Sequence, residues 1–371
     1  MKKILVFGMT DIPGGVESVI MNYYRNIDKN KIQFDFLCNN ETVAYSDEIE
    51  TLGGTIYQIT ARSKNYKLYQ KELKEFFEKN AQKYDTIWVN ICSLANIDYL
   101  KMAKKYGIKR RIIHCHNSQN MDSKLRGLLH KYNKIFIRKY ATEFWSCSDF
   151  SSPWFFSKSV MKSNSYKIIK NAIDLDKFQF NETIRNEYRK KLNIDKNTLV
   201  IGNVGRFHFQ KNHKFIIEIF EKILEERKDS ILLLIGTGED EETIKQLVKE
   251  KDIEANVKFL GKRNDVHNLM QAMDVFLFPS LFEGLGIVLI EAQTSGLITF
   301  ASSDNIPKEV CIDKEGFHFM SLNESSDAWK NAIMKKYTEK SIRTDNSALM
   351  RNCGYDIKKE CQEMQQFFEN N

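Results

Sequence analysis

The sequence predicts an α/β protein with two doubly wound, parallel-sheet domains. Its 371 residues exceed what one hydrophobic core usually supports, so two domains are expected. Short apolar runs typical of strands alternate with amphipathic helical patterns, and the alternation occurs twice along the chain. A βαβα order implies parallel strands with helices on both faces of the sheet. Each series therefore predicts one Rossmann-like domain.

The first domain is expected over residues 1–175. Its predicted strands are residues 4–7, 34–38, 86–90, 111–114 and 144–147. The last segment of the chain, 355–371, is expected to form a helix that crosses back to this domain.

The second domain is expected over residues 176–354, and we interpret the polar stretch at 176–194, which separates the two series of strands, as the region of the boundary. Its predicted strands and helices are 199–204, 215–228, 231–235, 241–251, 257–260, 275–278 and 298–301. Ligands of such sheets bind beyond the carboxyl ends of the strands. We therefore expect a site in a cleft across which the two domains face each other.

Composition indicates a globular protein and excludes several other classes. No apolar run approaches the roughly 18 residues that cross a bilayer, and the N-terminal strand runs into a glycine turn, unlike a signal peptide. A cytoplasmic location is expected. The seven cysteines are scattered without a Cys-x-x-Cys pair, so we expect reduced thiols rather than zinc or redox chemistry.

Positive charge is concentrated in one part of the chain. Residues 101–140 contain twelve Lys or Arg and one acid, Asp122, although the net charge is only +7. A patch of one sign indicates an anionic partner such as a membrane leaflet, a diphosphate or nucleic acid. Because apolar residues are interleaved with the cations, we expect a peripheral contact with the anionic inner face of the plasma membrane and no nucleic acid. The apolar residues concerned are Leu128, Leu129, Ile135 and Phe136.

Two carboxylates, Glu283 and Glu291, follow the predicted strand 275–278. Pro279 ends this strand, and a loop with Gly284 and Gly286 opens a helix. At about 1.5 Å per helical residue, the carboxylates can stand roughly 10 Å apart, a separation suited to the two hydroxyl-bearing rings of a sugar nucleotide. Acids also favour first helical turns for dipole reasons. Glu291, however, follows four apolar residues and should be half-buried, where a carboxylate needs hydroxyl or cationic partners.

Two further loops follow predicted strands. Paired glycines, Gly14 and Gly15, let backbone amides approach a ligand at a helix N-terminus, although a plain turn is the commoner role and no G-x-G-x-x-G supports a dinucleotide. Arg206 and Lys211 bracket the turn after strand 199–204 and could clamp a diphosphate from two sides. A solvated loop is the alternative.

Two histidines, His114 and His116, stand on one face at the end of strand 111–114. They raise the possibility of a metal site, but no nearby Asp, Glu or His supplies further ligands at useful spacing. We expect one histidine to face the cleft, the other to pack, and no metal to bind.

Taken in order, these motifs resemble a known family over nearly the full length. They are 14–17 (GGVE), 114–117 (HCHN), 147–148 (CS), 171–174 (NAID), 205–206 (GR) with 211–212 (KN), 259–261 (FLG) with 265–266 (DV), the glutamate pair, and 306–309 (IPKE). The chain resembles a family 4 retaining glycosyltransferase of the GT-B fold, of the kind that builds bacterial capsular, exopolysaccharide or O-antigen chains. Many members have proline where this chain has Gly286 and Leu297.

The resemblance implies roles for the residues of the second domain. Arg206 and Lys211 would neutralise the leaving diphosphate, Glu291 would bind the ribose hydroxyls, and Glu283 the hydroxyls of the donor sugar. The amides of Gly284, Leu285 and Gly286 would point at the sugar or phosphate, and the backbone around Arg263 would meet the base.

In the first domain, the resemblance places Gly14 and Gly15 at the phosphate and acceptor side and His116 beside the reacting sugar. The implied reaction moves a hexosyl unit from a nucleotide diphosphate sugar, expected to be a UDP-sugar, to a hydroxyl of a glycan or polyprenyl-linked glycan with retention. Neither a metal nor a cofactor is expected, since Arg206 and Lys211 would stabilise the developing charge.

Two other classes share this architecture. A sugar-nucleotide epimerase would form product without an acceptor. A non-catalytic partner subunit would keep the fold alone, and the intact set of Arg206, Lys211, Glu283 and Glu291 argues against that reading.

Overall fold

The structure, a computed structural model, describes residues 1–119, 123–339 and 343–370. The chain forms two compact units. Unit 1 combines Met1–Ala172 with Ile357–Asn371, and unit 2 is Ile173–Asp356. The limits expected from the sequence, 175 and 354, lie close to these.

Unit 1 contains a seven-stranded parallel sheet in the order β3-β2-β1-β4-β5-β6-β7. Because β1 pairs with both β2 and β4, the strand order reverses between β1 and β4. The strands are β1 Lys2–Phe7, β2 Ile32–Cys38, β3 Ile56–Gln58, β4 Thr86–Ile91, β5 Arg110–Cys115, β6 Glu143–Ser146 and β7 Tyr166–Ile168. The helices are α1 Gly15–Asn26, α2 Ser46–Thr51, α3 Tyr66–Asn80, α4 Asp98–Lys105, α5 Lys124–Phe136, α6 Ser152–Phe155, α7 Lys158–Met161 and α16 Ile357–Glu369.

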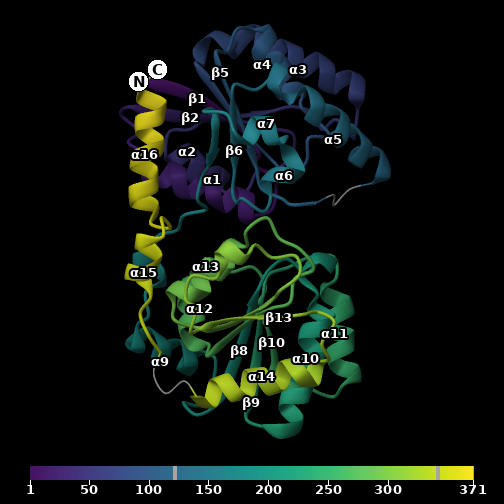
Figure 1. The fold of residues 1–371 in the computed structure, drawn as a ribbon, viewed down its shortest axis with the longest axis vertical. Coiled ribbons are helices and arrows are strands. Elements are labelled where there is room, and N and C mark those ends of the chain that lie inside the picture. The colour runs from purple at the N-terminus through teal and green to yellow at the C-terminus, as the bar shows by residue number, and fades with distance from the viewer. Residues whose placement is uncertain (120–122, 340–342, 371) are drawn as a thin grey trace. The chain divides into compact units, whose positions relative to one another are not determined.

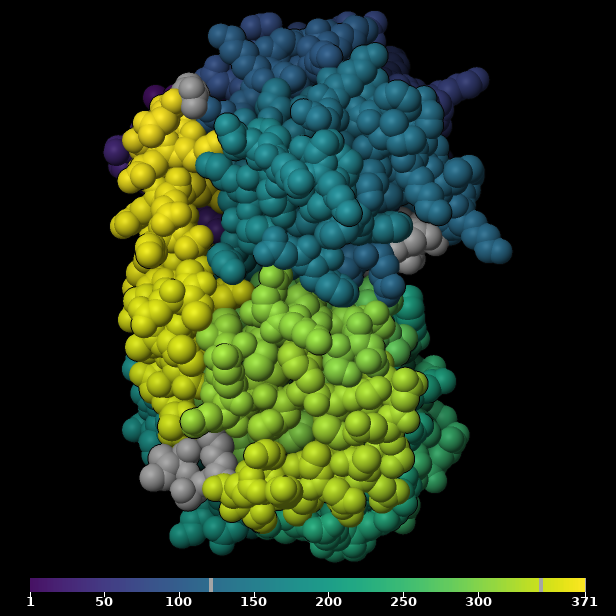
Figure 2. Space-filling view, in the orientation of Figure 1, coloured from purple at the N-terminus to yellow at the C-terminus, as the bar shows by residue number. Residues whose placement is uncertain are grey.

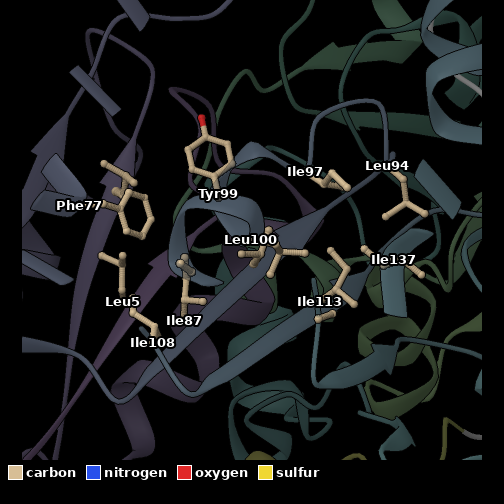
Figure 3. Packing of buried hydrophobic residues seen from close by; sticks show 14 of the residues in the cluster. Leu5, Phe77, Ile87, Leu94, Ile97, Tyr99, Leu100, Ile108, Ile113 and Ile137 are labelled. Atoms are coloured by element: carbon tan, nitrogen blue, oxygen red, sulfur yellow. The ribbon is translucent and has the colours of Figure 1, made fainter. Parts of the chain in front are cut away.

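The core of unit 1 forms where apolar side chains of the central strands meet the helices. Figure 3 shows Leu5 of β1, Ile87 of β4 and Ile113 of β5 in one cluster with Phe77 of α3 and Leu100 of α4. All five are buried. This packing fixes the carboxyl ends of β1, β4 and β5, which carry the candidate site residues of this unit.

Unit 2 contains a six-stranded parallel sheet in the order β10-β9-β8-β11-β12-β13, so the order reverses between β8 and β11. The strands are β8 Leu199–Val204, β9 Ser230–Ile235, β10 Val257–Phe259, β11 Val275–Phe278, β12 Ile298–Ser302 and β13 Phe317–Met320. The helices are α8 Leu175–Phe178, α9 Glu182–Lys191, α10 His213–Glu226, α11 Glu241–Glu250, α12 Val266–Ala272, α13 Ile287–Thr294, α14 Ser326–Glu339 and α15 Ser347–Asn352. The prediction of two doubly wound parallel sheets is confirmed.

The expected boundary stretch, 176–194, lies just after the start of unit 2 at Ile173. It forms α8 and α9 within unit 2. Arg185 and Arg189 of α9 bind opposite oxygens of Asp274 at 2.6 and 2.8 Å, and Arg189 is buried. Two charged side chains of this polar stretch therefore anchor α9 to the start of β11.

Helix α16 returns the chain to unit 1, beside α1 (Figure 1). Its last carbonyls accept hydrogen bonds from Lys2, whose Nζ lies 3.0 Å from Phe368 O, and from Arg110, whose Nη1 lies 2.8 Å from Phe367 O. In Figure 2 it forms a yellow strip against the teal atoms of unit 1. None of the helices in the described segments is long and apolar enough to cross a membrane.

Candidate active site

Three loops gather at the carboxyl ends of neighbouring strands in unit 2. They follow β8, β9 and β11, and β8 lies between the other two. A Cβ added to Gly236 would stand 2.0 Å from Gly205 O, and one added to Gly238 would stand 2.3 Å from Phe207 O. The β8 and β9 loops therefore touch through their backbones, which only glycine allows at these positions.

A buried ion pair joins the β8 and β11 loops. Lys211 Nζ lies 2.6 Å from Glu283 Oε1, and the two side chains are only 17% and 9% exposed. The ammonium also stands 4.6 Å from the centroid of the Phe278 ring, a cation–π contact. The Lys211 methylenes would be 3.2 Å from a Cβ at Gly205, so this glycine makes room for the lysine.

Arg206 pairs with a different acid. Its Nη2 lies 3.0 Å from Glu239 Oε2 in the β9 loop, and the side chains are 54% and 48% exposed. His208 Nε2 lies 3.5 Å from the other Glu239 oxygen. A hydrogen bond from its own backbone N–H, together with Arg206, holds the pKa of Glu239 below its usual value. Arg206 and Lys211 thus extend from one loop, but each contacts its own glutamate rather than a shared point.

Glu291 lies in α13, about one turn from the helix start. It is half-buried, and desolvation raises the pKa of its carboxyl to about 7. Within the described segments this carboxylate accepts no hydrogen bond and forms no ion pair, and burial is the only cause of the pKa shift. A desolvated acceptor of this kind can bind hydroxyl donors that the protein itself does not provide.

The loop before α13 positions its amides through glycine. Gly286 has φ +81° at the helix N-cap, a left-handed conformation, and Leu285 is buried. The amides of Gly284, Leu285 and Gly286 therefore lie between the Glu283 carboxylate and the helix. In the β10 loop, the Arg263 guanidinium binds Asp265 at 2.8 and 2.7 Å, which leaves the backbone around Arg263 for any contact with a base.

In unit 1, the loop after β1 leads into α1 at Gly14 and Gly15. The Glu17 carboxylate accepts the N–H of Gly14 at 3.1 Å and the hydroxyl of Thr10 at 2.6 Å. Glu17 thus supplies the acidic half of a capping box, in which its carboxylate accepts the N–H of the N-cap residue, and fixes the turn. A Cβ on Gly15 would meet no heavy atom within 4 Å, so the space before this helix is open.

His116 lies just after β5, close to the end of β4. Its Nε2 is 2.9 Å from Asn90 Oδ1, and Asn90 Nδ2 is 3.3 Å from the carbonyl of Phe7. This orientation of the amide makes Oδ1 the acceptor, so Nε2 carries the proton and Nδ1 can accept. Desolvation lowers the pKa of His116 to about 3, which keeps the ring neutral.

His114 has a structural position. It is fully buried, its ring centroid lies 4.1 Å from that of His116, and neither ring nitrogen has a partner in the described segments. One histidine is therefore packed and the other half-buried. Nowhere among the described residues do three His, Cys, Asp or Glu side chains form a group that could hold a metal ion.

The sequence analysis gave no role to Glu17, although it lies in the 14–17 motif, and did not single out Glu239. Both were recognisable in outline, because Glu17 stands at capping-box distance from Gly14 and Glu239 follows the glycines 236 and 238 after a strand. The structure gathers Arg206, Lys211, Glu283 and Glu239 on the contacting loops of unit 2, and it places His116 and the Gly14–Gly15 turn in unit 1.

Comparison with known proteins assigns the family. The sequence profile of the family "Glycosyl transferases group 1" matches residues 184–354. The putative glycosyltransferase EpsF of Bacillus subtilis is 30% identical over 329 residues, which cover 87% of this chain and 84% of EpsF. The capsular polysaccharide biosynthesis glycosyltransferase CapH of Staphylococcus aureus is 22% identical over 96% of this chain and 95% of its own.

Among solved structures, Anabaena HepE in complex with UDP-glucose aligns over 100% of both chains with a TM-score of 0.80 and 18% identity. This likeness shows the fold, which is GT-B with two Rossmann-like parallel-sheet domains. Together with the relatives it confirms the resemblance on which the sequence interpretation rested. The chain belongs to the group 1 glycosyltransferases.

Proposed function

We propose that the chain transfers a hexosyl unit from a UDP-sugar to a hydroxyl of a glycan or polyprenyl-linked glycan, with retention at the anomeric carbon and without a metal ion. The observation that carries the proposal is the buried Lys211–Glu283 ion pair, together with Glu291 of the following helix, whose desolvated carboxyl has no partner among the described residues. A sugar nucleotide offers hydroxyls and a diphosphate, which are the groups that such a set of side chains binds.

The leaving group is the first part of the mechanism. Departure of the diphosphate develops negative charge, and preorganised cations act most where charge develops. Lys211 is held in place by Glu283 and Phe278. Arg206 forms only an exposed pair with Glu239, and such pairs contribute about 0–1 kcal/mol, so a diphosphate can displace Glu239 at little cost. These two cations supply the positive charge that a metal would otherwise provide.

The remaining residues bind and orient the donor. Glu291 accepts from the ribose hydroxyls, Glu283 orients the hydroxyls of the sugar, and the amides of Gly284, Leu285 and Gly286 approach the sugar or phosphate. The backbone around Arg263 contacts the base. In unit 1, Gly14 and Gly15 line the phosphate and acceptor side, where Gly15 leaves open space, and neutral His116 accepts a sugar hydroxyl through Nδ1.

The choice of donor and product follows from what relatives are said to bind and make. The HepE complex contains UDP-glucose, and CapH is named for capsular polysaccharide biosynthesis. Both support a UDP-sugar donor and a role in surface polysaccharide synthesis. Membership of a transferase family favours transfer over the epimerase and partner-subunit alternatives.

The experiment combines binding and transfer. A thermal-shift panel of UDP-, GDP- and dTDP-sugars identifies the donor, since a ligand that binds only the folded protein raises its melting temperature. Transfer to glycan acceptors is then measured with that donor, with and without EDTA, and the anomeric configuration of the product is read by NMR. Product that appears without acceptor would indicate an epimerase instead.

The matched variants are Arg206→Ala and Lys245→Ala. Both remove an exposed, ion-paired cation from unit 2, but Lys245 pairs with Glu242 on α11. We expect Arg206→Ala to lower kcat by about 100-fold or more with an unchanged melting temperature, and Lys245→Ala to leave both unchanged. Wild-type turnover in Arg206→Ala would refute the diphosphate clamp.

A further inference from the structure

Helix α5, Lys124–Phe136, packs on unit 1 with an inverted pattern. Its buried side consists of Gly127, His130 and Asn133, which carry no aliphatic side chain. His130 Nδ1 accepts the N–H of Leu94 at 3.0 Å, and Asn133 Nδ2 donates to the carbonyl of Leu94 at 2.7 Å. Polar groups therefore anchor the helix, whereas ordinary surface helices bury an apolar stripe.

The apolar residues of α5 face solvent instead. They recur at helical spacing and form one stripe, and they are nearly half of the large hydrophobic side chains exposed in the described part of the chain. The stripe consists of Leu125 (67% exposed), Leu128 (64%), Leu129 (36%), Tyr132 (60%), Ile135 (73%) and Phe136 (41%). Blue side chains of this segment project from the surface at the right of Figure 2. A contiguous exposed stripe of this kind marks an interaction surface.

Cations are interleaved with the stripe in the sequence and follow it. From residue 123 to 142 the sequence has six Lys or Arg and no Asp or Glu. The Nζ atoms of Lys101, Lys104 and Lys139 stand 5.8, 5.9 and 5.9 Å from the centroid of the Tyr140 ring, so three positive charges share one small area. Lys104 Nζ also donates to the carbonyl of Lys139 at 2.8 Å, which ties α4 to the end of this segment.

We infer that α5 is an interfacial helix that docks on an anionic lipid bilayer. The stripe enters the boundary between headgroups and acyl chains, and these cations contact lipid phosphates. A second copy of the chain is a poorer occupant, because a two-fold contact would set the same cations against each other. The inference goes beyond the proposed function, since docking requires neither donor nor acceptor.

The test uses the full chain without any sugar nucleotide or acceptor. Co-sedimentation is measured with vesicles of phosphatidylcholine alone and of phosphatidylcholine mixed with phosphatidylglycerol, at low and high salt. We expect binding to the anionic vesicles that weakens as salt is raised. Equal binding to both vesicle types, or none to either, would overturn the inference.

Two pairs of variants separate apolar from charge contributions. Leu128→Ser with Ile135→Ser should weaken vesicle binding at least tenfold, whereas Leu68→Ser with Leu349→Ser, exposed sites outside α5, should not. Lys104→Gln with Lys139→Gln should weaken it by about fivefold per lysine, and Lys71→Gln with Lys74→Gln on α3 should have little effect.

Sedimentation velocity distinguishes a membrane-docking helix from an interface between two copies of the chain. Because Leu128 and Ile135 are largely exposed, their serine variants should keep the wild-type melting temperature. If the wild type were a dimer that these substitutions dissociate, and vesicles bound neither form, the stripe would be an interface between copies and the membrane inference would be wrong.

Discussion

At the residue scale, Glu291 is held in a state that costs the protein stability. Its carboxyl is desolvated without a compensating partner in the described segments, and its pKa is about 7 rather than 4.5. Ionisation of such a group opposes folding, because the unfolded chain gives up the same proton more easily. A residue that weakens the fold in this way is typical of a binding site.

The substitution Glu291→Gln tests this cost directly. Between pH 4.5 and about 7 the folded protein holds a proton that the unfolded chain loses, so wild-type stability falls as pH rises through this window. At pH 8 we expect the variant to be more stable by roughly 1–3 kcal/mol, and the gain should vanish near pH 4.5. Urea unfolding at several pH values measures it, and a variant less stable than wild type at pH 8 would contradict the account.

The same substitution, Glu291→Gln, should lower the affinity for the nucleotide sugar although it raises stability. If the ionised carboxylate accepts the ribose hydroxyls, affinity in the wild type should fall as pH is lowered through about 7, while Glu291→Gln should bind weakly and without this pH dependence. Isothermal titration against the donor found in the thermal-shift panel measures both. Equal affinity for the two proteins at pH 8 would remove Glu291 from the site.

The roles of Lys211 and Glu283 are tested by comparing a single variant with a double variant of the ion pair. Removing one partner of a buried ion pair leaves the other charge uncompensated, so Lys211→Met should destabilise the protein by about 3–5 kcal/mol. Lys211→Met with Glu283→Gln should restore most of the stability and none of the transfer activity. If the double variant regained activity, the pair would be structural only.

These residues also show how far sequence reasoning reaches. Glu283, Glu291, Arg206 and Lys211 could be selected because each follows a recognisable strand. Their partners could not be predicted, because each contact joins loops that follow different strands. Lys211 in the β8 loop binds Glu283 in the β11 loop, and Arg206 in the β8 loop binds Glu239 in the β9 loop. The roles carried over from the family remain predictions.

At the scale of elements, the central strands were predictable because they are continuous apolar runs. Of the short, partly buried edge strands, β10 was predicted, whereas β3, β7 and β13 were not. The helix α9 was not expected within the polar stretch 176–194, because its position is fixed by the contact of Arg189 with Asp274, which lies 85 positions away in the chain. Long-range ion pairs leave no periodic signal in a sequence.

The contact between the β8 and β9 loops depends on glycine at position 236, because any Cβ there would collide with the carbonyl of Gly205. Gly236→Ala places a Cβ against Gly205 O at a φ of +137°, so we expect a loss of at least about 3 kcal/mol together with loss of donor binding. Gly261→Ala is the control, because its φ of +61° is also positive but its Cβ would meet nothing within 4 Å. It should cost only about 1–2 kcal/mol, and similar losses in both variants would contradict the packing argument.

At the scale of the whole molecule, α16 completes the core of unit 1. The Phe368 ring lies 6.1 Å from that of Phe34 and 6.2 Å from that of Trp145, measured between centroids. Phe368→Ala should therefore cost about 3–5 kcal/mol. Hydrogen exchange should show faster amide exchange in β1, β2 and β6 and unchanged exchange in β8 and β9. Leu349→Ala, an exposed site in unit 2, is the control, and uniform acceleration in both units would contradict the assignment.

The discontinuity of unit 1 has a consequence for biosynthesis. Unit 2 is one uninterrupted segment, whereas unit 1 needs α16, which follows unit 2 in the chain. During translation, domains fold as their residues emerge from the ribosome. Unit 2 can therefore reach its native state first, while the apolar surface of Phe34 and Trp145 waits uncovered until α16 has been made. We therefore expect the nascent unit 1, although nearer the N-terminus, to expose apolar surface for longer during synthesis than unit 2.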